Sequence, residues 1–64
     1  MKLIVPDLSC GHCVSTVTQA IKALDPNADV EADLAARTVR AATTASAEAV
    51  TAALARLGYP SRPA

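Results

Sequence analysis

The chain has 64 residues, with six basic and six acidic side chains that give a formal net charge of zero at pH 7. Apolar residues make up 52% of the sequence, yet there is one tyrosine and no phenylalanine or tryptophan. Such a chain lacks both the basic surface and the aromatic stacking platform that nucleic-acid binding uses, which argues against a DNA or RNA partner. A chain this short forms one small domain, and we expect residues 1–64 to be that domain.

The first expected element is a strand over residues 2–6, where Leu3 and Val5 alternate with their neighbours until Pro6 ends the run. This apolar run is too short for a secretory signal, which needs roughly 7–15 apolar residues, or for a membrane span of about 20. We therefore expect a cytoplasmic protein that does not insert into a membrane. In that compartment thiols stay reduced, so a structural disulfide is not expected.

A loop over residues 7–11 and a helix from about Cys13 to Leu24 follow. Ser9 or a neighbour is the expected N-cap, and proline ends the helix after Asp25 because it disfavours helical backbone in the residue before it. Apolar residues recur at the spacing of one helical face: Val14, Val17, Ile21 and Leu24.

Two alternating segments predict an antiparallel hairpin joined at Ala35-Ala36. In the segment 28–34 one side is apolar and the other acidic, and we interpret the acidic side as a solvated face. The segment 37–42 turns two apolar residues inward. The residues expected to face inward are Ala28, Val30, Ala32, Leu34, Val39 and Ala41.

A second helix is expected to begin at the N-cap Ser46 and to end before Gly58, a residue type that favours the position after a helix. Residues 59–62 are expected to form a short edge strand, where prolines are tolerated. The apolar face of this helix consists of Val50, Ala53, Leu54 and Leu57.

The order strand, helix, strand, strand, helix, strand predicts an α+β fold of the ferredoxin-like βαββαβ type. Its four-stranded antiparallel sheet carries both helices on one face. Chain direction then brings three connections to one end: the cysteine loop, the Ala35-Ala36 hairpin and the Gly58-Tyr59 turn.

Both cysteines, Cys10 and Cys13, lie at the start of the first helix with His12 between them. The positive end of the helix dipole lowers thiol pKa values, and thiolates are soft ligands for Cu(I), Zn or Hg. Structural zinc normally takes four protein ligands, so two sulfurs suit Cu(I) better. His12 is either a third ligand or a residue that tunes the thiolates. A thioredoxin-like redox pair is the rival, but that fold is larger and has a neighbouring tryptophan.

In this frame the chain resembles the heavy-metal-associated domain family and its stand-alone members, the CopZ-type copper chaperones. The resemblance begins with the strand and the Leu8-Ser9-Cys10-Gly11-His12-Cys13 segment that follows it. It extends over nearly the whole chain, through residues 30–34, Thr38-Val39 and Leu57-Gly58-Tyr59.

The resemblance implies Cu(I) held by Cys10 and Cys13 and transferred by ligand exchange to the metal-binding domain of a copper-transporting P-type ATPase. It also implies that Tyr59 lies near the metal loop. Ser9 stands where zinc or cadmium members often carry an acidic residue, which favours Cu(I). Leu8 replaces a methionine that packs beneath the loop in the family, and its similar volume should make the exchange inexpensive.

The hypothesis is a carrier and not an enzyme, since no nucleophile, base and orienting group form a set. Alternatives are a binding domain for another soft metal (Zn, Hg or Ag), a regulatory domain of a larger metal pump, and a thiol-disulfide redox protein. Met1 directly before the first strand, and an end directly after the last, favour a complete small protein over the pump domain. A homodimer bridged by copper through four cysteines stays open, as does a docking role for Arg37 and Arg56 near the metal end.

Overall fold

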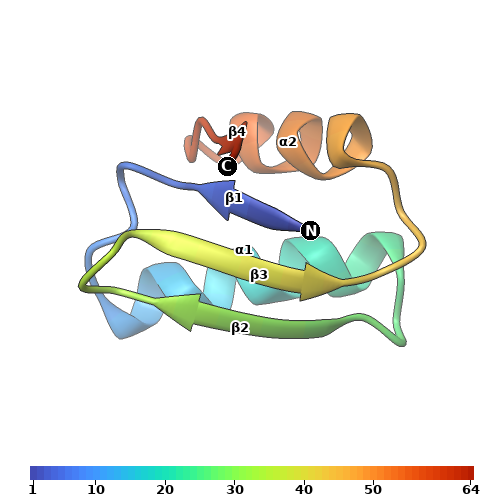
Figure 1. Ribbon diagram of the computed structural model, residues 1–64, viewed down its shortest axis with the longest axis horizontal. Helices are drawn as coiled ribbons and strands as arrows, with labels where there is room; N and C mark the ends of the chain where they lie inside the picture. The colour runs from blue at the N-terminus through green and yellow to red at the C-terminus, as the bar shows by residue number, and fades with distance from the viewer.

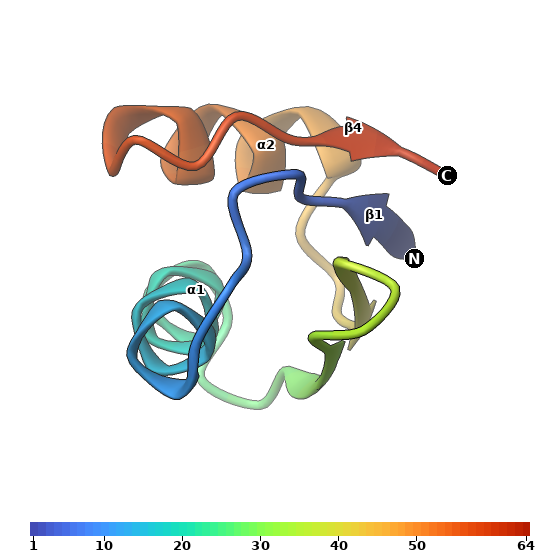
Figure 2. The ribbon, with the colours of Figure 1, turned by 90° about the vertical axis from the view of Figure 1, so that its left-hand side faces the viewer.

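Four strands and two helices follow one another in the predicted order in the structure, a computed structural model that describes residues 1–64. The strands pair antiparallel in the order β2-β3-β1-β4. Both helices cover the same face of this sheet (Figures 1 and 2). The predicted ferredoxin-like fold is therefore confirmed. The elements are β1 (Lys2–Ile4), α1 (Gly11–Leu24), β2 (Asp29–Asp33), β3 (Thr38–Ala42), α2 (Ala47–Arg56) and β4 (Arg62–Pro63).

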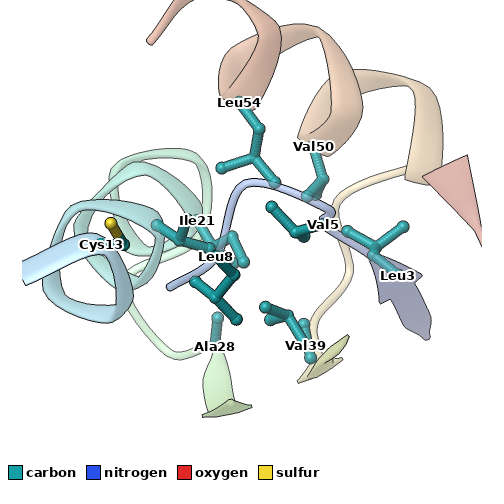
Figure 3. Packing of buried hydrophobic residues seen from close by; sticks show 11 residues of the cluster. Leu3, Val5, Leu8, Cys13, Ile21, Ala28, Val39, Val50 and Leu54 are labelled. Atoms are coloured by element: carbon teal, nitrogen blue, oxygen red, sulfur yellow. The ribbon is translucent and has the colours of Figure 1, made fainter. Parts of the chain in front are cut away.

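The core lies between the helices and the sheet and consists of eleven buried residues, none larger than leucine or isoleucine (Figure 3). Each helix and each of the strands β1 and β3 contributes the face that its alternation or helical spacing predicts. Three further residues lie outside these elements: Val5 and Leu8 between β1 and α1, and Ala28 directly before β2. The buried set is Leu3, Val5, Leu8, Cys13, Val17, Ile21, Ala28, Val39, Ala41, Val50 and Leu54.

Three leucines that the patterns place on buried faces are instead exposed, so these predictions were wrong. Leu24, Leu34 and Leu57 are 44%, 42% and 50% exposed. Each stands at or just beyond the end of its element, where the opposing layer no longer covers the side chain. Leu24 is the last residue of α1, Leu34 follows β2, and Leu57 is the C-cap of α2.

Several predicted boundaries also shift. The first helix begins at Gly11 with Cys10 as its N-cap, two residues earlier than expected, and Ser9 does not cap it. Strand β1 stops at Ile4 because Val5 opens a turn that the Leu8 N–H closes by donating to the Val5 carbonyl at 3.0 Å. The last strand is Arg62–Pro63 instead of residues 59–62, since Tyr59 takes part in the turn that ends α2.

The hairpin between β2 and β3 has a four-residue connection, residues 34–37, in place of the expected Ala35-Ala36. Asp33 Oδ1 accepts the Ala36 N–H at 3.1 Å, which stabilises the turn from within. Arg37, expected to open the next strand, ends the turn in left-handed backbone with φ of 54°. This conformation costs a residue with a Cβ roughly 1–2 kcal/mol.

The loop before α1, the β2–β3 hairpin and the turn after α2 lie together at one end of the molecule (Figure 1). This is the juxtaposition that chain direction predicts, and it brings segments distant in sequence around the two cysteines. Neither helix has the length and apolar character needed to cross a bilayer.

At the opposite end Asp25 joins the end of α1 to the segment that leads into α2. Its Oδ2 accepts the Thr43 hydroxyl at 2.8 Å and the Thr44 N–H at 3.2 Å, and its Oδ1 accepts the Asn27 N–H at 3.1 Å. Hydrogen bonding from Thr43, and then from the Thr44 and Asn27 backbone, lowers the pKa of the Asp25 carboxyl.

Because the pKa of Asp25 is lower in the folded state, its stabilising contribution is complete above the ordinary aspartate pKa and is lost as pH falls through the folded value. We expect the unfolding free energy of the wild type to decline on acidification, and Asp25→Asn to weaken that decline and to lower stability at neutral pH. Denaturant unfolding from neutral pH into the acid range measures both effects. Asp29→Asn, which removes an exposed carboxylate without hydrogen bonds, is the control and should leave the decline in place. An unchanged acid profile in Asp25→Asn would refute this role.

Candidate metal-binding loop

Leu8 anchors the loop that carries the cysteines. Its side chain is fully buried, and its N–H closes the turn to Val5. In Figure 3 it lies in the middle of the cluster, close to Ile21 and above Ala28. Burial of a leucine side chain contributes about 1.5–3 kcal/mol, so the loop is fixed at this point. Leu8 therefore packs in the core beneath the loop, as predicted.

The two cysteines differ in their surroundings. Cys10 is the N-cap of α1 and is exposed, whereas Cys13, in the first turn of the helix, is 9% exposed. Both thiols are free, with 3.2 Å between the two Sγ atoms. The pair therefore combines one sulfur fixed at the edge of the core with one that solvent and other molecules can reach.

The helix start adds positive potential at this pair. The first N–H groups of an α-helix, here those of Gly11, His12 and Cys13, have no partner within the helix, and the Cys10 side chain makes no capping hydrogen bond. The dipole of the helix is positive at this end. Both features favour negative charge near this end of the helix.

Polar groups gather around the Cys13 sulfur. Hydrogen bonding from the Tyr59 hydroxyl, then from Cys10 and from the Ser9 backbone N–H, outweighs partial burial and lowers the pKa of the Cys13 thiol to about 6. The Ser9 hydroxyl lies 4.0 Å from the same sulfur. The neighbouring Cys13 sulfur in turn raises the pKa of the Tyr59 hydroxyl. The lowered pKa favours the thiolate form of Cys13, which is the form that binds metals.

The turn after α2 is what brings Tyr59 to the loop. Gly58 adopts left-handed backbone with φ of 84°, and its N–H donates to the Ala55 carbonyl at 3.1 Å. The Tyr59 N–H donates to the Leu54 carbonyl at 2.9 Å. These two bonds are the Schellman pattern, for which glycine is the favoured residue at the left-handed position. The helix end thereby turns the chain back toward the cysteines.

The other candidate residues take less direct positions. His12 is exposed in the first turn of α1; its carbonyl accepts the Thr16 hydroxyl at 3.0 Å, and its ring makes no hydrogen bond within the protein. The structure gathers no group of three or more His, Cys, Asp or Glu side chains. His12 is accordingly not brought together with the two thiols as a three-ligand set. Arg37 and Arg56 are both exposed. Arg37 ends the β2–β3 hairpin and Arg56 is the last residue of α2, and both of these segments reach the end of the molecule that carries the cysteine loop (Figure 1).

A metal bonded to both sulfurs requires them to move apart. With metal–sulfur bonds of about 2.3 Å, the sulfurs are about 3.8 Å apart in tetrahedral geometry and about 4.6 Å apart in linear geometry. Both separations exceed the observed 3.2 Å. Because Cys13 is buried and Cys10 is exposed at a helix end, the Cys10 side chain is the one that has room to move.

Comparisons with known proteins show which sequences and folds this chain resembles. The sequence matches the heavy-metal-associated domain over residues 2–60. No curated protein sequence matches the chain. Among solved structures, a gold-binding protein is 45% identical, with a TM-score of 0.92 and coverage of 97% of this chain and 95% of that one.

Two further solved structures are similar over nearly the whole chain. A trimeric, copper-bound form of the copper chaperone Atx1 from Synechocystis PCC6803 is 31% identical, with a TM-score of 0.93 and coverage of 97% of this chain and 98% of that one. Oxidised MerP from Ralstonia metallidurans is 29% identical, with a TM-score of 0.83 and coverage of 95% and 89%. With a family match over nearly its whole length and the paired cysteines at the start of α1, the chain belongs to the heavy-metal-associated domain family.

Proposed function

We propose that this protein is a Cu(I) carrier that binds the ion through the thiolates of Cys10 and Cys13 and is not an enzyme. The observation that supports this most directly is the asymmetric thiol pair, a buried Cys13 and an exposed Cys10 with 3.2 Å between their sulfurs. Thiolates prefer soft ions, and two of them satisfy Cu(I) without the closed four-ligand set of structural zinc.

Transfer by ligand exchange follows from the exposure of Cys10. An incoming thiolate bonds to the under-coordinated Cu(I) first, and the Cu–S bond to Cys10 then breaks, so the ion is never free. The oxidation state of copper does not change in this exchange. Cys13 leaves last because its nearly buried sulfur is less accessible to the incoming thiolate than the exposed sulfur of Cys10. His12 and Ser9 modulate the thiolates from the side and are not required as ligands.

The acceptor we propose is the metal-binding domain of a copper-transporting P-type ATPase, with transfer in the cytoplasm. Such an acceptor must offer thiolates at an accessible surface, and the same requirement is met by a second copy of this chain. Two copies that share one Cu(I) through four cysteines would form a metal-bridged homodimer. The copper-to-protein ratio distinguishes one Cu(I) per chain from one Cu(I) shared by two chains.

Gold(I) is a second candidate cargo. The gold-binding protein shares more of this sequence than the copper chaperones do, at 45% identity against 31%. Gold(I) is a soft monovalent ion, and soft thiolates suit it for the reason that they suit Cu(I). Competition between the two ions at the same pair of thiols would decide which one the site prefers, with Zn, Hg and Ag(I) as further competitors.

Replacing either cysteine tests the ligand pair. We expect Cys10→Ser and Cys13→Ser each to weaken Cu(I) binding by more than the roughly 10–100-fold typical of lost supporting contacts, because a hydroxyl is a poor ligand for a soft ion. An anaerobic titration against a colorimetric Cu(I) chelator measures the affinity. Ser15→Ala, on the exposed side of α1, is the control and should bind like wild type.

Wild-type affinity in either cysteine variant would contradict the two-thiolate site. Absence of tight binding to any soft metal, together with reversible disulfide chemistry, would instead favour the redox alternative.

Replacing Tyr59 with phenylalanine tests whether the Tyr59 hydroxyl lowers the pKa of the Cys13 thiol. The ring remains but the hydroxyl is lost, so we expect the pKa of Cys13 to rise from about 6 toward the ordinary cysteine value. The pH dependence of Cys13 alkylation, followed by peptide mass spectrometry, measures the change. Ser9→Ala removes the smallest of the hydrogen-bonding contributions and should shift the profile less. A larger rise of the Cys13 pKa in Ser9→Ala than in Tyr59→Phe would contradict the conclusion that the Tyr59 hydroxyl is the main stabilising partner.

A further inference from the structure

We propose that Arg37 is a positioning residue that orders the metal-binding loop from the neighbouring hairpin. Arg37 is distant from Pro6 in sequence, yet its guanidinium Nη1 donates to the Pro6 carbonyl at 2.9 Å. The Arg37 carbonyl also accepts the Val5 N–H at 2.8 Å. Arg37 thus bonds to the N–H of Val5 and to the carbonyl of Pro6, directly before the loop that carries the cysteines. The inference deepens the proposed function and rests on it for its effect on metal binding.

The Pro6 carbonyl needs this donor because of the turn in which it lies. Val5 to Leu8 form a β-turn closed by the Leu8 N–H. The carbonyl of the second residue of such a turn has no partner within the turn. An arginine N–H that reaches it from another element satisfies the carbonyl with a charge-assisted hydrogen bond.

The direction of that carbonyl decides the conformation of the turn. Type I and type II turns differ by a flip of the peptide between the second and third residues, here the Pro6–Asp7 peptide. Type II needs a positive φ at Asp7, but Arg37 is the one non-glycine residue with positive φ. The guanidinium therefore holds the peptide in an orientation that keeps Asp7 in ordinary backbone.

The backbone of Arg37 supports a role for its side chain. Its φ of 54° is a conformation that glycine adopts without strain and that other residues adopt uncommonly. The hairpin alone would favour glycine at this position. Compared with glycine, an arginine at this position adds the hydrogen bond to the Pro6 carbonyl, and this bond stabilises the metal-binding loop.

The consequence is a loop that is already ordered before metal binds. Leu8 fixes the loop by its buried side chain, and Arg37 fixes the direction in which the chain approaches Leu8. Loss of the guanidinium lets the turn open more often and the Pro6–Asp7 peptide reorient, which exposes the Leu8 N–H to solvent, and this motion passes to Ser9 and Cys10. Ordering the loop on binding then costs affinity.

Three variants of Arg37 separate its side chain from its backbone. Arg37→Ala removes the guanidinium and keeps the strain, Arg37→Gly removes both, and Arg37→Lys keeps a donor able to reach the carbonyl. Arg56→Ala is the charge control, because Arg56 is an exposed arginine at the C-terminal end of α2 whose side chain makes no hydrogen bond. For each protein the amide hydrogen exchange of Leu8 is measured without metal, the melting temperature is recorded, and Cu(I) affinity is determined by chelator competition.

We expect Arg37→Ala and Arg37→Gly to speed exchange of the Leu8 amide and to weaken Cu(I) binding about three- to tenfold, as the loss of one hydrogen bond of roughly 1 kcal/mol implies. Arg37→Gly should do so without a lower melting temperature, since it also relieves strain. Arg37→Lys should keep much of the wild-type protection of the Leu8 amide and much of the wild-type Cu(I) affinity. Arg56→Ala should match the wild type in both.

Wild-type exchange and affinity in Arg37→Gly would overturn the inference, as would an equal loss of affinity in Arg56→Ala. If the wild type itself fails to bind Cu(I), the proposed function fails, while the exchange of the Leu8 amide still decides whether Arg37 orders the loop.

Discussion

The burial of Leu8 is the constraint on which the site depends. A loop between a strand and a helix would ordinarily be mobile, but this one inserts a side chain into the centre of the core. With Leu8 held, only Ser9 and Cys10 stand between the core and the first turn of α1. Cys13 is consequently at the edge of the packed interior, and Cys10 is exposed.

This arrangement separates two demands that a metal carrier must meet. Retention requires a ligand that other molecules reach less easily, which the burial of Cys13 provides in the proposed site. Release requires a ligand that an acceptor can approach, which the exposure of Cys10 provides. Placing these demands on different residues lets a chain with a small core hold the metal and still transfer it. A fully buried pair would retain the ion and be inaccessible to the acceptor.

The sequence predicts the fold and the cysteine pair because both are encoded locally. Alternation in the strands, helical spacing and the N-cap Ser46, whose hydroxyl accepts the Ala49 N–H at 3.1 Å, are all read over a few residues. The failures lie where local patterns end, as with Leu34 in the hairpin. Chain direction places the Gly58-Tyr59 turn at the same end as the cysteines, but only the family resemblance implies that Tyr59 itself lies near the metal loop, because that contact depends on how two distant turns meet. Nothing in the sequence indicates the hydrogen bond from Arg37 to Pro6, because neither residue type predicts a partner that far along the chain.

We expect metal binding to move Cys10 against a scaffold that is otherwise already formed. The decisive measurement is a comparison of backbone amide chemical shifts between the metal-free and the Cu(I)-loaded protein. Changes should be confined to residues 9–14 and to the neighbourhood of Tyr59, with the amides of β1, β3 and the anchor Leu8 unaffected. Changes that spread through Leu8 and the strands behind it would show instead that the metal itself organises the loop.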